Sequence, residues 1–288
     1  MKSEKFCNNC PRMCGVDRVN VNGFCGCDST FKIAKIMKHF GEEPVITGTN
    51  GSGTIFFSGC VLKCPFCQNY PISHQLKGSI YTASQLEYSI YDLEQQGVHN
   101  INLVSPTQFL HLLVPVLEKC KSRLSIPVVY NTGGYERPEM IRKLQGLVDI
   151  YLPDLKYFDN SYGMKYSKAD NYFDYASKSI QEMLRQQPEC VIEDGIMKKG
   201  VIVRHLVLPT LYKDSMKLME WLSQLENRPL VSVMRQYTPC YDADKYKELT
   251  RRITSFEYEK VVDKCAEFGL QGFTQLKGCE TLDMTPDF

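Results

Sequence analysis

The sequence predicts an α/β protein, a partial TIM-like (β/α)6 barrel with a small N-terminal cysteine-rich metal-binding segment. Two observations support this fold class. Short apolar runs alternate with runs of helical periodicity over residues 54–275, and such alternation is typical of parallel βαβ units. Cysteines gather in two blocks, one within residues 7–27 and one within residues 60–67. We therefore expect residues 1–50 to form the metal-binding segment and residues 51–288 to form the barrel core.

The expected elements follow from periodicity, capping residues and turn residues, taken in chain order. Residues 29–39 carry apolar side chains at helical spacing behind a Ser/Thr cap, and residues 48–53 resemble a linker. Strands are expected at 54–57, 100–104, 127–131, 148–152, 201–207 and 230–234, with a short last strand at 271–275. Helices are expected at 82–96, 108–120, 138–144, 171–185, 215–225 and 256–268. The tyrosine-rich stretch 157–175 is expected to be a long loop with the start of a helix, either a surface loop or a substrate clamp.

Length and charge exclude several classes of protein. The chain has 288 residues, 43% of them hydrophobic, which suits one large α/β domain or two small ones. A net charge of +1 argues against the basic surface that nucleic-acid binding requires. No apolar stretch is long enough to span a bilayer, and residues 1–5 are not followed by a segment like that of a signal peptide. We therefore expect a cytoplasmic protein that binds neither nucleic acid nor a membrane.

The second cysteine block predicts an iron–sulfur site. Cys60, Cys64 and Cys67 have the spacing C-x3-C-x2-C, and they follow the strand expected at 54–57. Three thiolates so placed can hold three corners of a [4Fe-4S] cluster and leave one iron without a protein ligand. An open coordination position is where a catalytic metal meets its substrate. The alternative is a structural zinc loop or a group of buried thiols, with His74 as the nearest candidate for a fourth zinc ligand.

The first cysteine block predicts a second metal centre. Cys7, Cys10 and Cys14 have the spacing C-x2-C-x3-C, and Cys25 and Cys27 follow within a glycine-rich stretch. Five cysteines compete for four positions, and we expect the first four to be the ligands with Cys27 as the spare. The metal is zinc or a second iron–sulfur cluster, because tetrahedral thiolate sites suit both. A segment this short also lacks the apolar content to fold without such a centre.

The cysteine loop resembles that of the radical S-adenosylmethionine (radical SAM) enzymes, whose motif is C-x3-C-x-aromatic-C. Phe66 occupies the aromatic position. The resemblance implies that SAM chelates the open iron, that an electron from the cluster breaks a carbon–sulfur bond of SAM, and that the 5′-deoxyadenosyl radical takes a hydrogen atom from a substrate. The cofactors perform the difficult step while the protein positions and shelters them. The resemblance also implies an electron donor such as flavodoxin or ferredoxin.

A narrower resemblance is to the pyruvate formate-lyase activating enzyme-like branch, the glycyl-radical-enzyme activases. The stretches that look like that branch are 7–18, 102–107, 129–135 and 203–209. The resemblance implies a protein or peptide substrate, because the family's activases abstract a hydrogen atom from a backbone glycine. Two other functions stay open: a radical SAM enzyme that modifies a small molecule, and an iron–sulfur or zinc protein that binds or transfers electrons without SAM chemistry.

Polar residues follow the expected strands at their carboxyl ends, where the chemistry of such barrels gathers. The segment Asp154-Leu155-Lys156 resembles the Asp-x-Lys of the activases, which lies at the SAM site, although a surface salt pair is the alternative. Arg204 matches a basic residue near the SAM carboxylate, and Asn131 suits the ribose hydroxyls.

Many radical SAM proteins hold the SAM amino group with Gly-Gly-Glu after the second strand, where this chain has Ser105-Pro106-Thr107. The hydroxyls of Ser105 and Thr107 are therefore expected to accept from the SAM ammonium without a formal charge. His205 is expected to point away from Arg204, because neighbouring side chains in a strand alternate. The sequence identifies no catalytic side chain.

Overall fold

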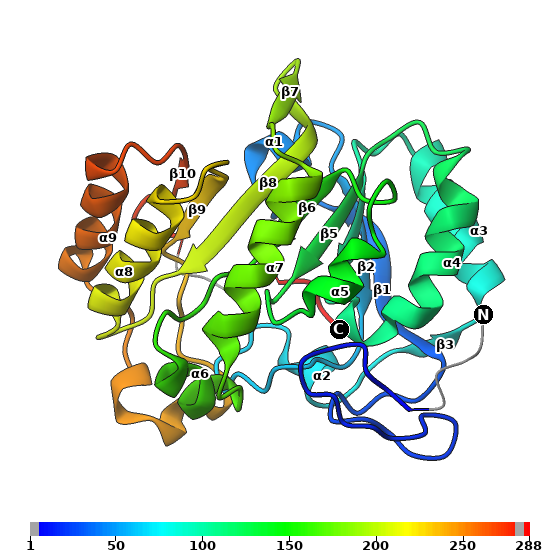
Figure 1. Cartoon of the computed structure of the whole chain (residues 1–288), viewed down its shortest axis with the longest axis horizontal. Coiled ribbons are helices and arrows are strands. Elements are labelled where there is room, and N and C mark those ends of the chain that lie inside the picture. Colours follow the sequence, from blue (N-terminus) through cyan, green and yellow to red (C-terminus); the bar gives the residue numbers. More distant parts are fainter. Residues whose placement is uncertain (1–5, 280–284) are drawn as a thin grey trace.

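The computed structural model describes residues 6–279 and 285–288 and has one curved sheet with helices on its outer face (Figure 1). The strands are β1 (Phe31–His39), β2 (Ser52–Phe57), β3 (Ser79–Tyr81), β4 (Ile101–Val104), β5 (Val128–Thr132), β6 (Ile150–Pro153), β7 (Val191–Glu193), β8 (Ile196–Leu206), β9 (Leu230–Met234) and β10 (Gly272–Thr274). Their order in the sheet is β10-β9-β8-β6-β5-β4-β2-β1-β3, and β7 pairs with β8.

The longer helices connect the parallel strands, and short helices lie in the loops between strands. They are α1 (Pro44–Thr47), α2 (Tyr70–Ser73), α3 (Ala83–Gln95), α4 (Leu110–Lys121), α5 (Pro138–Arg142), α6 (Asn160–Ser167), α7 (Tyr172–Gln186), α8 (Tyr212–Ser223) and α9 (Ser255–Glu267). Short 3-10 turns lie at Thr107–Phe109, Tyr241–Lys245 and Lys247–Leu249. The neighbouring strands of the run β2-β4-β5-β6-β8-β9-β10 all pair in parallel, and β7 pairs antiparallel with β8 outside this run. The predicted partial (β/α)6 barrel is therefore confirmed.

The expected helix over residues 29–39 is wrong, because this stretch forms β1. It pairs antiparallel with β2 and with β3. Phe31 and Ile33 are buried while their neighbour Lys32 is half-buried, which is the alternation of a strand. The apolar residues of this stretch fit both a helical and a strand period over so short a run, and pairing with β2 decides the outcome.

The tyrosine-rich stretch 157–175 is ordered by packing. It contains α6 and the start of α7. Tyr157, Tyr166 and Tyr172 are all at most 1% exposed, and the ring centroids of Tyr157 and Tyr172 lie 5.4 Å apart. Aromatic burial of this kind holds the two helices against the sheet. The stretch is therefore helical and anchored to the core by these rings, which corrects the expected long loop, while a role as a substrate clamp stays a prediction.

The barrel is closed at the amino ends of its strands. Ile46 of α1 packs inside the barrel against Val129, Ile150, Leu152 and Ile202, all of them fully buried. Figure 1 shows α1 at the end of the sheet opposite α2. The interior is therefore filled at one end, and the chemistry is left to the other.

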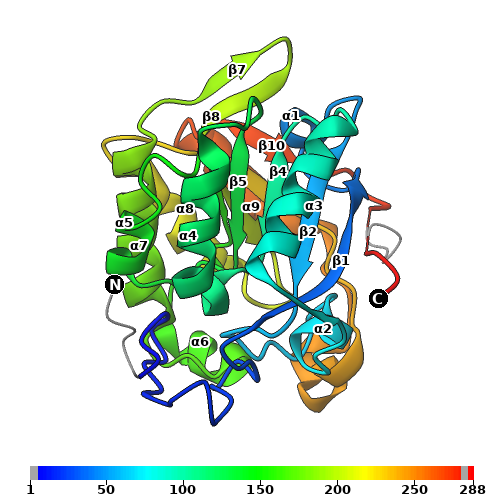
Figure 2. The ribbon, with the colours of Figure 1, turned by 90° about the vertical axis from the view of Figure 1, so that its right-hand side faces the viewer.

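Two further segments gather at the carboxyl ends of the strands. Residues 6–28 lie at the same end of the molecule as α2 and α6 (Figure 2). The segment 285–288 lies beside β1 in the same view, and the rings of Phe288 and Phe56 meet edge to face at 5.3 Å. No helix formed by the described residues has the length and apolar content that a membrane crossing requires.

Candidate active site

The three cysteines of the second block lie on the loop between β2 and α2, at the carboxyl end of the first parallel strand. Gly59 opens this loop with a φ of +79°, and a Cβ at this position would lie 2.3 Å from the Cys27 sulfur. Only glycine fits such a position without strain. The turn therefore directs Cys60, Cys64 and Cys67 over the barrel mouth.

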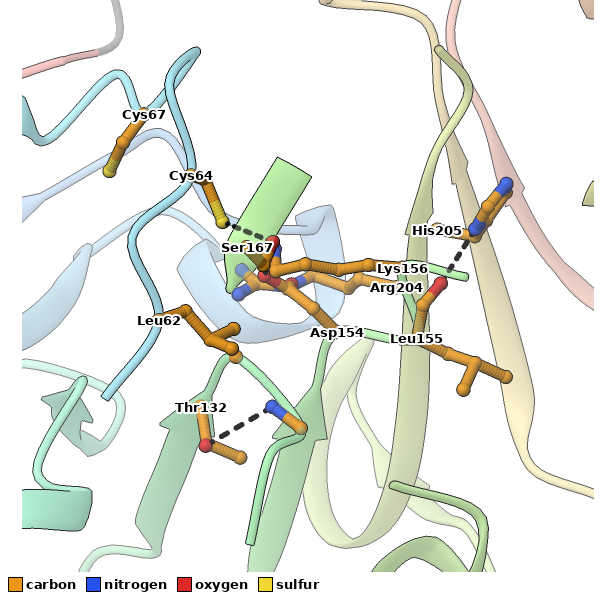
Figure 3. Close-up of polar contacts among 12 residues, drawn as sticks. Leu62, Cys64, Cys67, Thr132, Asp154, Leu155, Lys156, Ser167, Arg204 and His205 are labelled. Carbon is orange, nitrogen blue, oxygen red and sulfur yellow. Dashed lines mark hydrogen bonds and ion pairs between the residues drawn. The ribbon is translucent and has the colours of Figure 1, made fainter. Parts of the chain in front are cut away.

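Each of these sulfurs has a polar neighbour. The Leu62 N–H donates to Cys60 over 3.4 Å, and the Ser73 hydroxyl donates to Cys67 over 3.3 Å. Cys64 and the Ser167 hydroxyl are 3.0 Å apart (Figure 3). Within residues 6–279 and 285–288, no three Cys, His, Asp or Glu side chains converge closely enough to hold one metal ion. The support for a cluster at Cys60, Cys64 and Cys67 is therefore their spacing in the sequence and the position of their loop at the barrel mouth.

Burial makes the thiols of Cys60 and Cys67 poor acids on their own. It raises the pKa of Cys60 to about 12 and that of Cys67 to about 11, and the neighbouring cysteines add to the effect. Thiolates crowded in an apolar site need positive charge beside them, which the irons of a cluster supply. The chemistry of this donor set therefore fits an iron–sulfur cluster.

A cavity of about 220 Å³ joins the cysteine loop to the ends of the strands. Its walls include the loop residues Cys64, Phe66 and Cys67, together with polar side chains from other strands. Those polar residues are Glu42, Asn131, Asp154, Lys156, Arg204 and Gln236. Phe66 is held by Tyr237, whose ring centroid lies 5.7 Å away. The structure thus brings Phe66, Asn131, Asp154, Lys156 and Arg204 of the predicted cofactor-binding residues to one cavity.

Four charged side chains form a chain of alternating sign through this cavity. Lys156 donates to the Asp154 carboxylate over 2.7 Å. Arg204 donates to the other Asp154 oxygen over 3.0 Å and to Glu42 over 3.1 Å. The side chains of all four are at most 19% exposed. This is a buried network, and the alternative of a surface salt pair does not apply.

The electrostatics keep Asp154 and Lys156 ionised. Burial opposes the charge on Asp154, but Lys156 and Arg204 hold the pKa of its carboxyl below the usual range. Burial would lower the pKa of Lys156, but Asp154 raises it above its ordinary value. The ion pair between Asp154 and Lys156 is therefore maintained inside the cavity.

The two cations differ in what they can still bind. Arg204 donates to three partners, with the side-chain amide oxygen Oδ1 of Asn131 at 2.5 Å as the third. Lys156 has three donor hydrogens, and among the described residues its ammonium donates to Asp154 alone. Figure 3 shows Lys156 directed toward the side of the cavity where Cys64 lies. Lys156 is therefore the cation with donors to spare for a ligand carboxylate.

Glu42 was missed by the sequence analysis. It lies between β1 and α1 and enters the barrel beneath the cavity. Its carboxylate accepts from Asn102 over 2.9 Å, from Asn131 over 3.2 Å and from Arg204. The sequence carries no local sign of this role.

Two of the expected SAM contacts lie elsewhere. Thr107 is 3% exposed and donates to Glu136 over 2.5 Å, outside the residues that line the cavity. Ser105 has a left-handed φ of 55° and is held by its main chain, through a 2.8 Å bond to Asn131. Their contact with the SAM ammonium stays a prediction that this arrangement does not support.

His205 points away from the cavity, as the strand alternation predicts. Its Nδ1 lies 2.6 Å from the Leu155 carbonyl oxygen (Figure 3). Its Nε2 lies 2.8 Å from the Ser215 hydroxyl. Burial lowers the pKa of this imidazole to about 4, so it is neutral at physiological pH. His205 therefore fixes the segment that carries Asp154 and Lys156.

The first cysteine block packs directly on the cysteine loop. A Cβ on Gly23 would lie 3.5 Å from the Cys14 sulfur and 3.4 Å from that of Cys25, so these two sulfurs face the same space. Cys27 instead donates to the Ser58 carbonyl over 3.3 Å and is 3% exposed. The assignment of Cys27 as the spare cysteine stays a prediction.

Arg12 joins the first block to the barrel. Its Nε donates to the Val61 carbonyl over 2.8 Å, and its guanidinium also reaches the Ser167 carbonyl over 3.0 Å. Gln108 is a second connection, since its amide donates to the Ser58 carbonyl over 2.9 Å while its own carbonyl accepts from Asn9. Direct hydrogen bonds thus join the segment of the first cysteine block to the loop of the second.

The fold and this cavity place the chain in a known superfamily. Residues 54–222 match the family model of the Radical SAM superfamily, and the chain belongs to that superfamily. It is 32% identical over 273 residues to the protein MJ0674 of Methanocaldococcus jannaschii, a match that covers 92% of this chain and 76% of the relative.

Two further comparisons connect the chain to named enzymes. It is 24% identical over 234 residues to the pyruvate formate-lyase-activating enzyme of Clostridium pasteurianum, covering 75% of this chain and 89% of the relative. The crystal structure of Streptococcus suis SuiB bound to the precursor peptide SuiA superposes with a TM-score of 0.53 at 15% identity. That match covers 76% of this chain and 47% of SuiB, so it concerns the fold of the shared part.

Proposed function

We propose that this chain is a radical SAM enzyme that abstracts a hydrogen atom from a protein or peptide substrate, in the manner of a glycyl-radical-enzyme activase. Membership of the superfamily already implies a [4Fe-4S] cluster, SAM and the cleavage of SAM. The observation that carries the proposal is the single cavity that joins Cys64 and Cys67 to the charged side chains of Asp154, Lys156 and Arg204.

The residues of the chain have distinct tasks in this proposal. Cys60, Cys64 and Cys67 would hold the cluster, and when bound the cluster and SAM supply the radical that removes the hydrogen atom. Lys156 pairs with the carboxylate of SAM, because its ammonium retains free donors beside the cysteine loop. Arg204 holds Asp154 in place, and Phe66 and the barrel wall keep water away from the reacting atoms.

The substrate class rests on two comparisons. Similarity to the activating enzyme of Clostridium pasteurianum favours a protein substrate, and the shared fold with SuiB supports a barrel mouth that accepts a peptide. The cavity is lined by residues of the cysteine loop, so a chain bound beside this loop would reach it. An electron donor such as flavodoxin or ferredoxin would deliver the electron, and the cytoplasm is the compartment we propose.

We also propose that Cys7, Cys10, Cys14 and Cys25 hold a second metal centre, zinc or iron–sulfur. The sulfurs of Cys14 and Cys25 face the same space. A metal in this block would stiffen the segment from which Arg12 contacts the cysteine loop.

Anaerobic reconstitution tests the proposed function. With iron, sulfide, SAM and a strong reductant, the wild-type chain is expected to release 5′-deoxyadenosine and methionine. Substitution of Cys60, Cys64 or Cys67 by alanine should abolish this release, whereas Cys190→Ala, an exposed cysteine outside both blocks, should leave it unchanged. A full cluster that does not cleave SAM would contradict the proposal and favour an electron-transfer protein.

A second measurement tests the substrate class. Candidate partner proteins would be incubated with the active enzyme, and a glycine-centred radical would be sought by electron paramagnetic resonance. SAM cleavage that is stimulated only by small molecules would contradict the protein or peptide substrate and leave the radical chemistry intact.

A further inference from the structure

The segment 285–288 covers an apolar strip beside the cavity, and we call this strip the groove. Its floor is formed by Phe56 of β2, Val104 of β4 and Ile72 of α2, each at most 6% exposed. Met37 of β1 packs against them and extends the groove to the neighbouring strand. Phe56 and Val104 also line the cavity, so the groove and the cavity are continuous.

The segment 285–288 of the chain occupies this groove. Phe288 packs on Phe56 with ring centroids 5.3 Å apart and ring planes at 72°, which is a favourable edge-to-face contact. Thr285 and Pro286, three and two residues earlier, line the cavity itself. The segment therefore leads from the site of the chemistry to an aromatic subsite.

Two lysines hold the main chain of this segment. The ammonium of Lys35 donates to the Asp287 carbonyl oxygen over 2.8 Å, and that of Lys77 donates to the Phe288 carbonyl oxygen over 3.0 Å. A peptide of any sequence offers carbonyl oxygens like that of Asp287. The groove thus recognises an extended main chain together with one aromatic side chain, which is how peptide-binding clefts combine affinity and selectivity.

We propose that this groove is the docking surface of the substrate, an extended peptide that places an aromatic side chain on Phe56 and its main-chain carbonyls on Lys35 and Lys77. The proposal rests on the peptide substrate proposed above and names how that substrate is held. Residues 285–288 occupy the path of the peptide and leave it when the substrate binds.

The geometry also locates the reacting residue. In the bound segment, Thr285 and Pro286 border the cavity while Phe288 fills the aromatic subsite. An extended chain advances roughly 3.3 Å per residue, so two or three residues span roughly 7–10 Å. The residue that loses its hydrogen atom is therefore placed two or three positions before the aromatic anchor.

A competition experiment on the full chain tests the docking surface without any SAM chemistry. The probe is a fluorescein-labelled heptapeptide that copies residues 282–288, and its binding is followed by fluorescence anisotropy. Phe288→Ala removes the anchor of the resident segment, so the probe should bind this variant about tenfold more tightly than the wild-type chain. A probe with alanine in place of its phenylalanine should bind neither protein.

Control variants keep the outcome interpretable. Phe256→Ala, which removes an exposed ring on α9, should bind the probe as the wild type does. Adding Lys77→Met, an exposed side chain, to Phe288→Ala should weaken probe binding several-fold if the main-chain contact is real. Equal affinity of the wild-type and Phe288→Ala chains, or no dependence on Lys77 and on the probe phenylalanine, would overturn the docking surface.

Deuterium transfer separates this proposal from the proposed function. Peptides with an aromatic anchor would be deuterated at the residues two and three positions before it, and label would be sought in 5′-deoxyadenosine. Groove binding without any transfer would support the docking surface and contradict the peptide substrate. Transfer that does not depend on the aromatic anchor would overturn the docking surface and support the peptide substrate.

Discussion

The Arg204 guanidinium donates to the Glu42 carboxylate over 3.1 Å, although 162 positions separate the two residues in the chain. Glu42 precedes the short helix that fills the amino end of the barrel, and Arg204 lies on a central strand. The contact therefore ties the closed end of the barrel to the cavity. The Glu42 carboxylate also pairs with the Arg204 guanidinium, which would otherwise compete with Lys156 for the carboxylate of a bound ligand.

Substitution of Glu42 by glutamine should destabilise the protein and weaken SAM binding together. The variant leaves Arg204 with one charged partner fewer in a buried site, which is expected to lower the free energy of unfolding by about 1–3 kcal/mol. Urea denaturation would measure the change in stability, and calorimetry on the reconstituted protein would measure SAM affinity. Glu87→Gln, at an ion pair with the exposed Lys119, is the control and should change stability by less than about 0.5 kcal/mol.

Lys156→Met should affect SAM more than it affects folding. Asp154 retains its contact with Arg204 in this variant, so the buried carboxylate is not left alone. Loss of a charge-assisted hydrogen bond is expected to raise the dissociation constant of SAM about ten- to a hundredfold. An unchanged SAM affinity in titration calorimetry would show that another group pairs with the carboxylate.

Stability should fall in mild acid because His205 is buried as the neutral imidazole. Its pKa is lowered by burial to about 4, below the ordinary value near 6.5, so the unfolded chain binds more protons between these values. Its contribution is therefore complete above pH 6.5 and is lost as the pH falls toward 4. The full loss is about 3 kcal/mol. Urea denaturation at several pH values should show a flatter profile for His205→Gln than for the wild type.

Metal analysis of alanine variants should show whether Cys25 or Cys27 is the fourth ligand of the second metal centre. Cys25→Ala is expected to lower the metal content of the anaerobically purified protein by about one site, because it removes a ligand. Cys27→Ala should retain the metal and lose stability, since its thiol is buried against the Ser58 carbonyl. The opposite pattern would make Cys27 the fourth ligand.

Much of the barrel could be predicted because its signals are local. Parallel strands buried on both faces appear as short apolar runs, and capping residues mark the helices between them, as Thr82 and Thr254 do with complete capping boxes. The cysteine spacing is equally local. The elements that were not predicted are short, such as β3, β7, α1, α2 and α6, or lack a decisive period, as β1 does, since its apolar spacing fits two periods and its structure depends on the strand beside it.

The cavity could be predicted only where its residues follow strands. Asp154 and Lys156 were found by their position after β6, whereas Glu42 lies before a four-residue helix that has no periodic pattern. Its partners Asn102, Asn131 and Arg204 stand 60, 89 and 162 positions away. Thr107 shows the converse, since a 3-10 turn after β4 carries its hydroxyl to Glu136 on the outer side of the sheet. Such details depend on tertiary packing.

The helix α1, which fills the barrel at the amino ends of its strands, has a kinetic consequence. With Ile46 buried among the side chains of the interior, SAM and the proposed peptide would approach from the end of the barrel that carries the cysteine loop. If SAM binds deep in the cavity and the peptide lies across its opening, the two must bind in a fixed order, with SAM first. Product 5′-deoxyadenosine would stay trapped until the peptide departs, so the lifetime of the peptide complex, and not bond cleavage, would set the turnover rate.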